Sequence, residues 1–274
     1  MGGREGRVFQ FQQTIAGGLI LIAGLSSTPL WSAEKPAAER AIHGDASATD
    51  YLHRARDLRE RRLWRAAAIA YERAAHLDPA TPAEKELGMM MLECGKPKHA
   101  VIALDRHLDS APNDAAAFVA RARAHALLGD GLAAAADYSR AIDLLDSPDV
   151  DLYLERALTL REMEESAAEA VRGLDEGIAR LGPLLTLELA ALELEVRASD
   201  FDAALARIDH LASASPRKEM WLARKGEILE QSGRKEEAAR TYREAFAALA
   251  SLPPQLRMSR PMQELEQRLL RRLR

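Results

Sequence analysis

The sequence predicts an all-α protein, and three observations support this prediction. Of the 274 residues, 47% are apolar, which is enough for a buried core and too many for a wholly disordered chain. Runs rich in Ala, Leu, Glu and Arg dominate the chain, and these residues are strong helix formers. Val and Ile are sparse, and no run alternates apolar and polar residues with period two, so we expect no β-sheet.

The N-terminal segment is predicted to be an export signal. Arg4 and Arg7 precede an apolar stretch at 14–25, and the small residues Ser32 and Ala33 come just before a charged segment. This order is typical of a secretory signal peptide, and the apolar stretch is shorter than the roughly 20 residues that span a membrane. We therefore expect a periplasmic or secreted protein of a Gram-negative bacterium. The alternative is an uncleaved anchor in the inner membrane, with the rest of the chain facing the periplasm.

A pattern of small and aromatic residues recurs along the chain. Ala-x3-Tyr-x2-Ala begins at Ala67 and returns unchanged at Ala134 and Ala238. It also returns with replacements at the second and third positions at Ala100 and Ala204. Twelve residues before four of these alanines stands another small residue, and this set is Ala55, Gly88, Ala122 and Gly226. Small residues at fixed points let helices approach closely. Each interval of about 34 residues is therefore predicted to form two short antiparallel helices.

The ends of these predicted helices carry turn residues. Glycines at Gly95, Gly129 and Gly233 are expected to end the first helix of a pair in the left-handed conformation. Proline cannot continue a helix, and it follows the second helix in three of the pairs, at Pro79, Pro112 and Pro216.

This pattern resembles the tetratricopeptide repeat, whose signature has the same period and the same small, aromatic and proline positions. The resemblance covers about residues 48–250 and gives six units, which start near Ala48, Thr81, Ala115, Val150, Leu185 and Glu219. Unit four needs a one-residue slip and carries Gly173 and Gly177 in its second helix, and unit five has Leu192 where a small residue is expected. The resemblance implies a right-handed α-solenoid of antiparallel helical hairpins, with a concave face formed by the first helices.

The chain is thus divided into a signal peptide (1–33), a flexible linker (34–47), a repeat domain (48–252) and a C-terminal capping helix (253–274). The capping helix is amphipathic, with an apolar stripe of Met262, Leu265, Leu269 and Leu273 and with arginines crowding its end. We interpret it as a cover for the last repeat. The alternative is contact with an anionic membrane surface.

The resemblance also implies a binding groove. In the family, positions 5, 9 and 12 of each first helix point into the groove, and they share one helical face. The candidate contact residues in the first four units are Leu52, Arg56, Arg59, Lys85, Met89, Val119, Arg123, Leu154, Leu158 and Arg161. No acid occupies these positions, whereas unit six offers Glu227 and Glu230. The groove is therefore predicted to be basic and aliphatic over the first four units, and to suit an acidic and aliphatic segment of a partner protein. The alternative is a solvated helix face with no ligand.

Other functional classes receive little support from the sequence. The net charge of −4 argues against nucleic-acid binding, which usually needs a basic excess. No phosphate-binding loop or nucleophile elbow occurs, so we expect no enzyme activity and no cofactor. Cys94, His99 and His107 lie near one another in the sequence, but we interpret them as helix residues and expect no metal site. Cys94 is the single cysteine, so the fold must be held by packing without a disulfide.

These observations predict a non-enzymatic protein–protein interaction module. The favoured hypothesis is a periplasmic adaptor, scaffold or assembly factor for an envelope complex. The alternative is a membrane-anchored structural scaffold that keeps its N-terminal segment.

Overall fold

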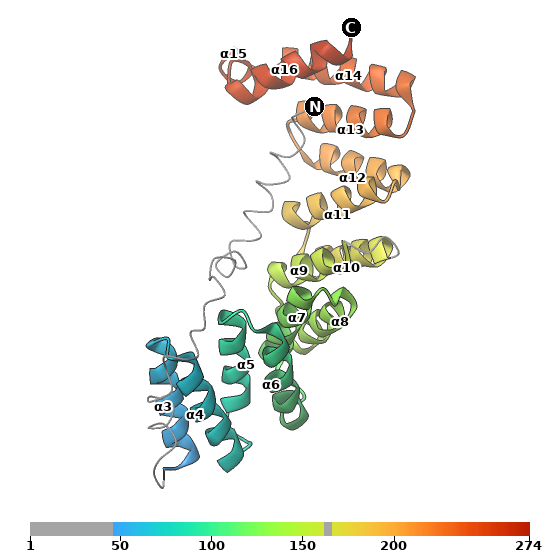
Figure 1. The fold of residues 1–274 in the computed structure, drawn as a ribbon. Coiled ribbons are helices and arrows are strands. Elements are labelled where there is room, and N and C mark those ends of the chain that lie inside the picture. Colours follow the sequence, from blue (N-terminus) through green and yellow to red (C-terminus); the bar gives the residue numbers. More distant parts are fainter. Residues whose placement is uncertain (1–45, 162–165) are drawn as a thin grey trace. The chain divides into compact units, whose positions relative to one another are not determined.

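The computed structural model describes residues 46–161 and 166–274, so the predicted signal peptide and almost all of the predicted linker lie outside the described residues. The described residues form fourteen α-helices and contain no strand (Figure 1). Successive helices pack against one another in pairs. The predicted all-α solenoid of helical hairpins is therefore confirmed. No helix in the described part is long and apolar enough to cross a membrane.

The chain divides into two compact units. We call the described residues up to Pro148 the N-unit, and those from Asp149 onward the C-unit. The N-unit contains α3 (Ala48–Glu60), α4 (Trp64–Leu77), α5 (Ala83–Glu93), α6 (Pro97–Ser110), α7 (Ala115–Leu128) and α8 (Gly131–Leu144). The C-unit contains α9 (Val150–Arg161), α10 (Ala167–Leu181), α11 (Leu185–Arg197), α12 (Phe201–Ala214), α13 (Glu219–Gln231), α14 (Lys235–Ala250), α15 (Pro254–Arg257) and α16 (Arg260–Arg272).

The first helix of each hairpin, which we call the A helix, starts where the repeat pattern places it. Five of the six A helices begin at the predicted residue, and α5 begins at Ala83, two residues after Thr81. Side chains set several of these starts, because a polar oxygen can accept a hydrogen bond from an otherwise unpaired amide in the first turn. Ser47 and Asp50 form a capping box before α3, and Asp114 accepts from the Ala117 amide at the start of α7.

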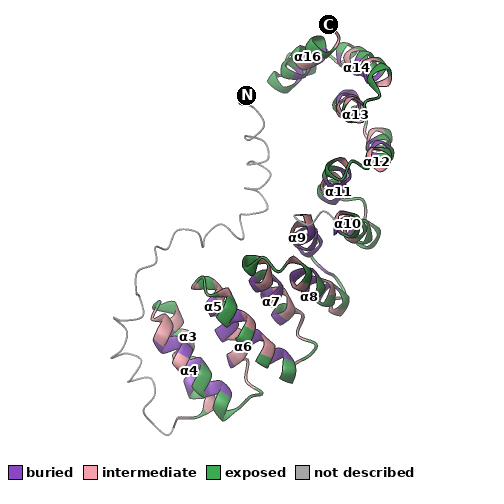
Figure 2. Cartoon of the chain, turned by 45° about the vertical axis from the view of Figure 1, so that its right-hand side comes forward, coloured by how far each residue is buried: buried purple, intermediate pink, exposed green. Residues whose placement is uncertain are grey.

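Small residues allow the A helix to meet the second helix of its hairpin, which we call the B helix. A Cβ atom added at Gly88 would lie 2.5 Å from Leu104 Cγ, and one added at Gly226 would lie 2.4 Å from Tyr242 Cε1. In unit four the glycine has moved to the B helix, where a Cβ at Gly177 would lie 2.9 Å from Tyr153 Cγ. The glycines that interrupt α10 are thus explained by close packing against α9. The helices of the hairpins turn a buried face to their neighbours and an exposed face outward (Figure 2).

The turn between the A and B helices repeats one conformation. The fifteenth residue of five units has a positive φ, and these residues are Arg62 (57°), Gly95 (64°), Gly129 (78°), Ser199 (60°) and Gly233 (81°). The fifteenth residue of unit four lies outside the described residues. The predicted left-handed glycines are therefore confirmed, and Arg62 and Ser199 adopt the same conformation although a side chain makes it costly.

The C-terminal helix α16 packs on α14 as predicted. Its apolar stripe is buried, and Met262, Leu265 and Leu269 join the core formed by α11 to α14. An apolar face that is already buried in the protein cannot also enter a membrane surface. The structure therefore favours the capping interpretation of α16 over membrane contact through this stripe.

Candidate protein-binding surfaces

The predicted groove residues of the N-unit lie on α3, α5 and α7, and we call the surface that carries them the A-helix face. Arg56 and Met89 are exposed to 43% and 39%, respectively. Arg123 is exposed, and Val119 is half-buried. Leu52 is different, because it lies in the core with only 6% exposure. Leu52 therefore packs in the core of the hairpin, and its contact with a partner stays a prediction.

Arg56 is held by an acid from the next repeat. Its Nε and Nη2 atoms donate to both carboxylate oxygens of Glu86 on α5, with an Nε–Oε2 distance of 2.9 Å. One helical turn further along, Arg59 pairs in the same way with Glu93, which stands 34 residues later. Such two-pronged pairs fix the plane of the guanidinium group. The arginines on α3 are therefore oriented by the neighbouring A helix.

A buried tyrosine completes the pair between Arg56 and Glu86. Tyr71 on α4 donates its hydroxyl hydrogen to Glu86 Oε2 at 3.2 Å. Burial and the nearby charge of Glu86 raise the pKa of Tyr71 to about 12, so the hydroxyl keeps its proton. Burial alone would raise the pKa of Glu86, but hydrogen bonds from Arg56 and Tyr71 and the charge of Arg56 hold this pKa below its usual value. Glu86 is therefore charged at neutral pH.

The basic residue of α5, Lys85, is also paired. Lys85 Nζ lies 2.8 Å from Asp114 Oδ2, and His107 Nε2 lies 2.9 Å from the same oxygen. Burial opposes the charge on Asp114, but the hydrogen bonds from Lys85, His107 and the Ala117 amide lower its pKa to about 2. His107 is thus a buried partner of Asp114, and it links α6 to the start of α7.

These contacts correct the predicted electrostatics of the groove. The prediction considered three positions of each A helix in the first four units and found no acid there. The structure brings Glu86, Glu93 and Asp114 from adjacent positions onto the same basic residues. The A-helix face is a row of ion pairs with exposed aliphatic atoms beside it, and it is not a uniformly basic lining. The repeat spacing between Arg59 and Glu93 was a signal in the sequence that could have revealed this row.

The predicted groove residues of unit four lie on α9 in the C-unit. Leu158 and Arg161 are half-buried, whereas Leu154 is buried at 9% exposure. Leu154, like Leu52, therefore belongs to the core. The α9 positions belong to the C-unit and are not part of the A-helix face.

Sequence reasoning missed a second set of charged residues, which lies partly buried between helices. Arg121 on α7 bridges Asp105 on α6 and Asp137 on α8, at 2.6 and 2.7–2.8 Å. In the C-unit, Arg207 contacts three acids, which are Asp175, Glu188 and Glu195. Buried charges need such partners. These arginines connect successive hairpins, and their extensive pairing makes them structural residues.

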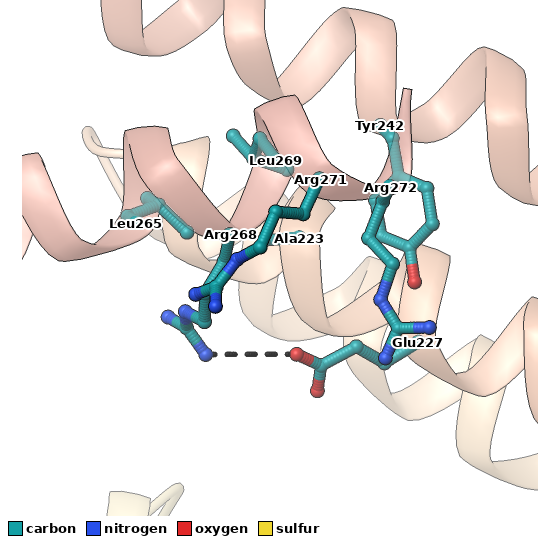
Figure 3. Close-up of a pocket in the computed structure, with 8 residues that line it drawn as sticks. All are labelled: Ala223, Glu227, Tyr242, Leu265, Arg268, Leu269, Arg271 and Arg272. Carbon is teal, nitrogen blue, oxygen red and sulfur yellow. Dashed lines mark ion pairs between the residues drawn. The ribbon is translucent and has the colours of Figure 1, made fainter. Parts of the chain in front are cut away.

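A pocket of about 420 Å³ lies between α13, α14 and α16. It is lined by Ala223, Glu227, Tyr242, Leu265, Arg268, Leu269, Arg271 and Arg272 (Figure 3). Arg272 Nη1 lies 2.7 Å from Glu230 Oε1, and Tyr242 donates to Glu230 Oε2 at 2.9 Å. Arg268 and Glu227 are 3.6 Å apart. The acids predicted for the groove of unit six therefore face the arginines of the capping helix.

The described residues show no group of three His, Cys, Asp or Glu side chains that could hold a metal ion. His99 is exposed, and Cys94 is a free, partly buried thiol that packs against the N-unit core.

No family model matches the sequence, and no curated protein matches it. Solved structures do match. The complex of Naa15 and Naa10 bound to HypK-THB aligns with a TM-score of 0.52 at 17% identity, over 88% of this chain and 38% of that chain. The chain has the tetratricopeptide-repeat fold.

Two further solved structures align with the chain less closely. A tetratricopeptide repeat protein from Parabacteroides merdae aligns at 17% identity over 88% of this chain and 92% of that one, with a TM-score of 0.45. PilF of Pseudomonas aeruginosa aligns at 14% identity over 87% and 99% of the two chains, also with a TM-score of 0.45. At 17% identity, the likeness to the complex of Naa15 and Naa10 establishes the fold alone.

Proposed function

We propose that this chain is a non-enzymatic protein-binding module, which holds an acidic and aliphatic segment of a partner on the A-helix face of the N-unit. One observation carries the proposal: Arg56 is fixed in place by Glu86 through Nε and Nη2, yet 43% of its side chain remains exposed. The Nη1 edge lies outside this pair and can donate to a second carboxylate. Pre-oriented donors lose little conformational entropy on binding.

Exposed apolar atoms lie on the same helices as these charges. Met89 follows Lys85 by one turn on α5, so the two side chains share one side of the helix. Methionine adapts its shape to different apolar partners. A segment that alternates acidic and aliphatic residues would place its acids near Arg56 or Lys85 and its apolar side chains on Met89 and Val119.

The solved structure of Naa15 and Naa10 bound to HypK-THB is an assembly of several proteins. Its likeness to this chain supports a protein partner over a small-molecule substrate. It does not indicate which protein the chain binds, because a fold alone does not determine a ligand.

We further propose that the mature chain acts in the bacterial envelope, as a periplasmic adaptor or assembly factor. The order of basic, apolar and small residues at the N-terminus supports export. The second candidate is a scaffold that keeps this segment as a membrane anchor. N-terminal sequencing separates the two, because cleavage predicts a soluble chain that starts near Ala33 or Glu34, whereas the scaffold keeps Met1 and stays with the membrane fraction.

The binding proposal is tested by capture of the partner from an envelope extract with the tagged chain. The double variant Arg56→Glu with Arg123→Glu should lose the partner, because it reverses two charges on the A-helix face. The matched variant Glu227→Lys with Glu230→Lys also reverses two charges, but in the C-unit, and it should still capture the partner. Circular dichroism and thermal melting check that both variants are folded. A folded Arg56/Arg123 variant that still recovers the partner at the wild-type level would contradict the proposal.

A further inference from the structure

The pocket between α13, α14 and α16 combines an apolar floor with an excess of positive charge. Leu265 and Leu269 of α16 and Ala223 of α13 supply the apolar part. Three guanidinium groups line the pocket, from Arg268, Arg271 and Arg272 (Figure 3). Two carboxylates, Glu227 and Glu230, oppose them. Glu227 also pairs with Arg224 at 3.0 Å. These six charged groups therefore carry a net charge of +2, which a bound carboxylate would reduce.

The three guanidinium groups differ in how closely they are paired with acids. Arg272 makes a short ion pair with Glu230 at 2.7 Å, whereas Arg268 is 3.6 Å from Glu227. Arg271 donates from Nε to the backbone carbonyl of Gln267 on its own helix, at 3.3 Å. Among the described residues, no acid is paired with Arg271. The guanidinium group of Arg271 is therefore the one with the greatest remaining capacity to bind an anion.

The pocket exists because α13 has a short side chain at the position that faces α16. Ala223 and Glu227 are one turn apart on α13, so both turn toward the same side. The alanine leaves open space above it, and the leucines of α16 enclose one side of that space. A volume of about 420 Å³ lies within the range of pockets that enclose small ligands. It is larger than a lone carboxylate needs, so the apolar walls can also receive neighbouring apolar groups.

We propose that this pocket is a binding site for a short peptide segment in which a glutamate or aspartate is flanked by aliphatic residues. The carboxylate binds to Arg271 and Arg268, since guanidinium groups bind carboxylates through paired hydrogen bonds. The aliphatic neighbours pack on Leu265, Leu269 and Ala223. This site lies entirely in the C-unit, and it does not depend on the function proposed for the A-helix face of the N-unit.

The test uses the full chain and the synthetic peptide N-acetyl-Leu-Glu-Leu-amide as the probe. Binding is followed at low salt through the NMR signal of the Arg271 Nε–H group, assigned by comparison with the Arg271→Gln variant. We expect a saturable shift of this signal. Arg268→Gln should raise the dissociation constant of the peptide by about tenfold or more, because a charge-assisted hydrogen bond is lost.

Two matched controls make the result specific. Arg260→Gln removes an arginine from the same helix, at a side chain that is 90% exposed and does not line the pocket, and it should leave the affinity within about twofold of the wild type, since an exposed charge contributes little. The peptide N-acetyl-Leu-Gln-Leu-amide should bind at least about tenfold more weakly, because the hydrogen bonds lose their charge.

Several results would overturn the proposal: no saturable shift at Arg271, equal binding of the glutamine peptide, or an equal loss of affinity in Arg260→Gln. A peptide that shifts only the signals of Arg56 and its neighbours would also overturn it, while supporting the function proposed for the N-unit. The two proposals can therefore fail separately.

Discussion

The N-unit and the C-unit each contain a buried tyrosine that donates to a glutamate, and this glutamate pairs with an arginine of another helix. In the N-unit these residues are Tyr71, Glu86 and Arg56, and in the C-unit they are Tyr242, Glu230 and Arg272. The two regions differ in whether the arginine precedes or follows the glutamate along the chain. The arginine comes from the earlier helix in the N-unit, and from the later helix, α16, in the C-unit. The capping helix is thus attached to the last repeat by the same kind of interaction that joins the A helices of neighbouring repeats.

The two regions also differ in the residue at position 5 of the A helix. Position 5 of unit one is Leu52, which is buried in the N-unit core. Position 5 of unit six is Ala223, which lines the open pocket. Both residues are buried, and Ala223 also borders the pocket.

The largest effect is expected where a glycine meets a rigid ring. Gly226→Val should lower the free energy of unfolding by ~2–3 kcal/mol, because overpacking against Tyr242 forces the ring or the helix to move. Gly88→Val in the N-unit should cost less, since the side chain of Leu104 is more adaptable than a ring. Chemical denaturation measures both. Ala247→Val, at an exposed position of α14, controls for the helix propensity of valine. Equal losses in all three variants would contradict this packing account.

The next effect is a pH dependence that belongs to the N-unit. The pKa of Asp114 is lowered to about 2, so its contribution is fully present above the unfolded pKa of about 4 and is lost as the pH falls through about 2. Asp114→Asn keeps the helix cap but loses the charge. The wild type should therefore exceed this variant in unfolding free energy by ~1–2 kcal/mol at pH 6, and the difference should shrink toward pH 2. A difference that stays constant between pH 6 and pH 2 would contradict a contribution from the charge of Asp114.

The equivalent glutamates provide a direct comparison of the two regions. Glu86→Gln should destabilise the chain by ~1–2 kcal/mol, because its carboxylate is mostly buried and receives hydrogen bonds from both Arg56 and Tyr71. Glu230→Gln should cost less than ~1 kcal/mol, because the pair of Glu230 and Arg272 is more exposed. Urea titrations of the two variants test this order. A larger loss at Glu230 would mean that the cap depends on its ion pair more than on its apolar stripe.

The sequence was sufficient to predict features that depend on local residue patterns. The small residues, the turn glycines and the periodic apolar positions determine hairpins of about 34 residues, so the starts of the A helices and the stripe on α16 could be predicted. The pairing of Arg56 with Glu86 and of Lys85 with Asp114 depends on how one repeat is rotated against the next. The burial of Leu52 and Leu154 depends on the same packing, so the repeat pattern alone did not predict it.

The smallest effect concerns the two turns that lack glycine. Arg62 and Ser199 adopt the left-handed conformation that glycine adopts in three other units. Ser199→Gly and Arg62→Gly should each stabilise the chain by ~0.5–1 kcal/mol, because glycine removes the steric cost of this conformation. Thermal melting should show raised midpoints for both variants. Gly129→Ala makes the reverse change and should lower the midpoint. A destabilised Ser199→Gly variant would indicate that the serine side chain has a role beyond the turn.

The central claim is that a partner protein covers the A-helix face of the N-unit, and hydroxyl-radical footprinting of methionines tests it most directly. Met89 lies on this face with 39% of its side chain exposed, and Met258 lies in the C-unit with 71% exposed. Each can be followed by the mass of its sulfoxide. In the complex with the captured partner, we expect the oxidation rate of Met89 to fall several-fold, while that of Met258 stays unchanged. Oxidation of Met89 at the same rate in the free and the bound chain would contradict the claim.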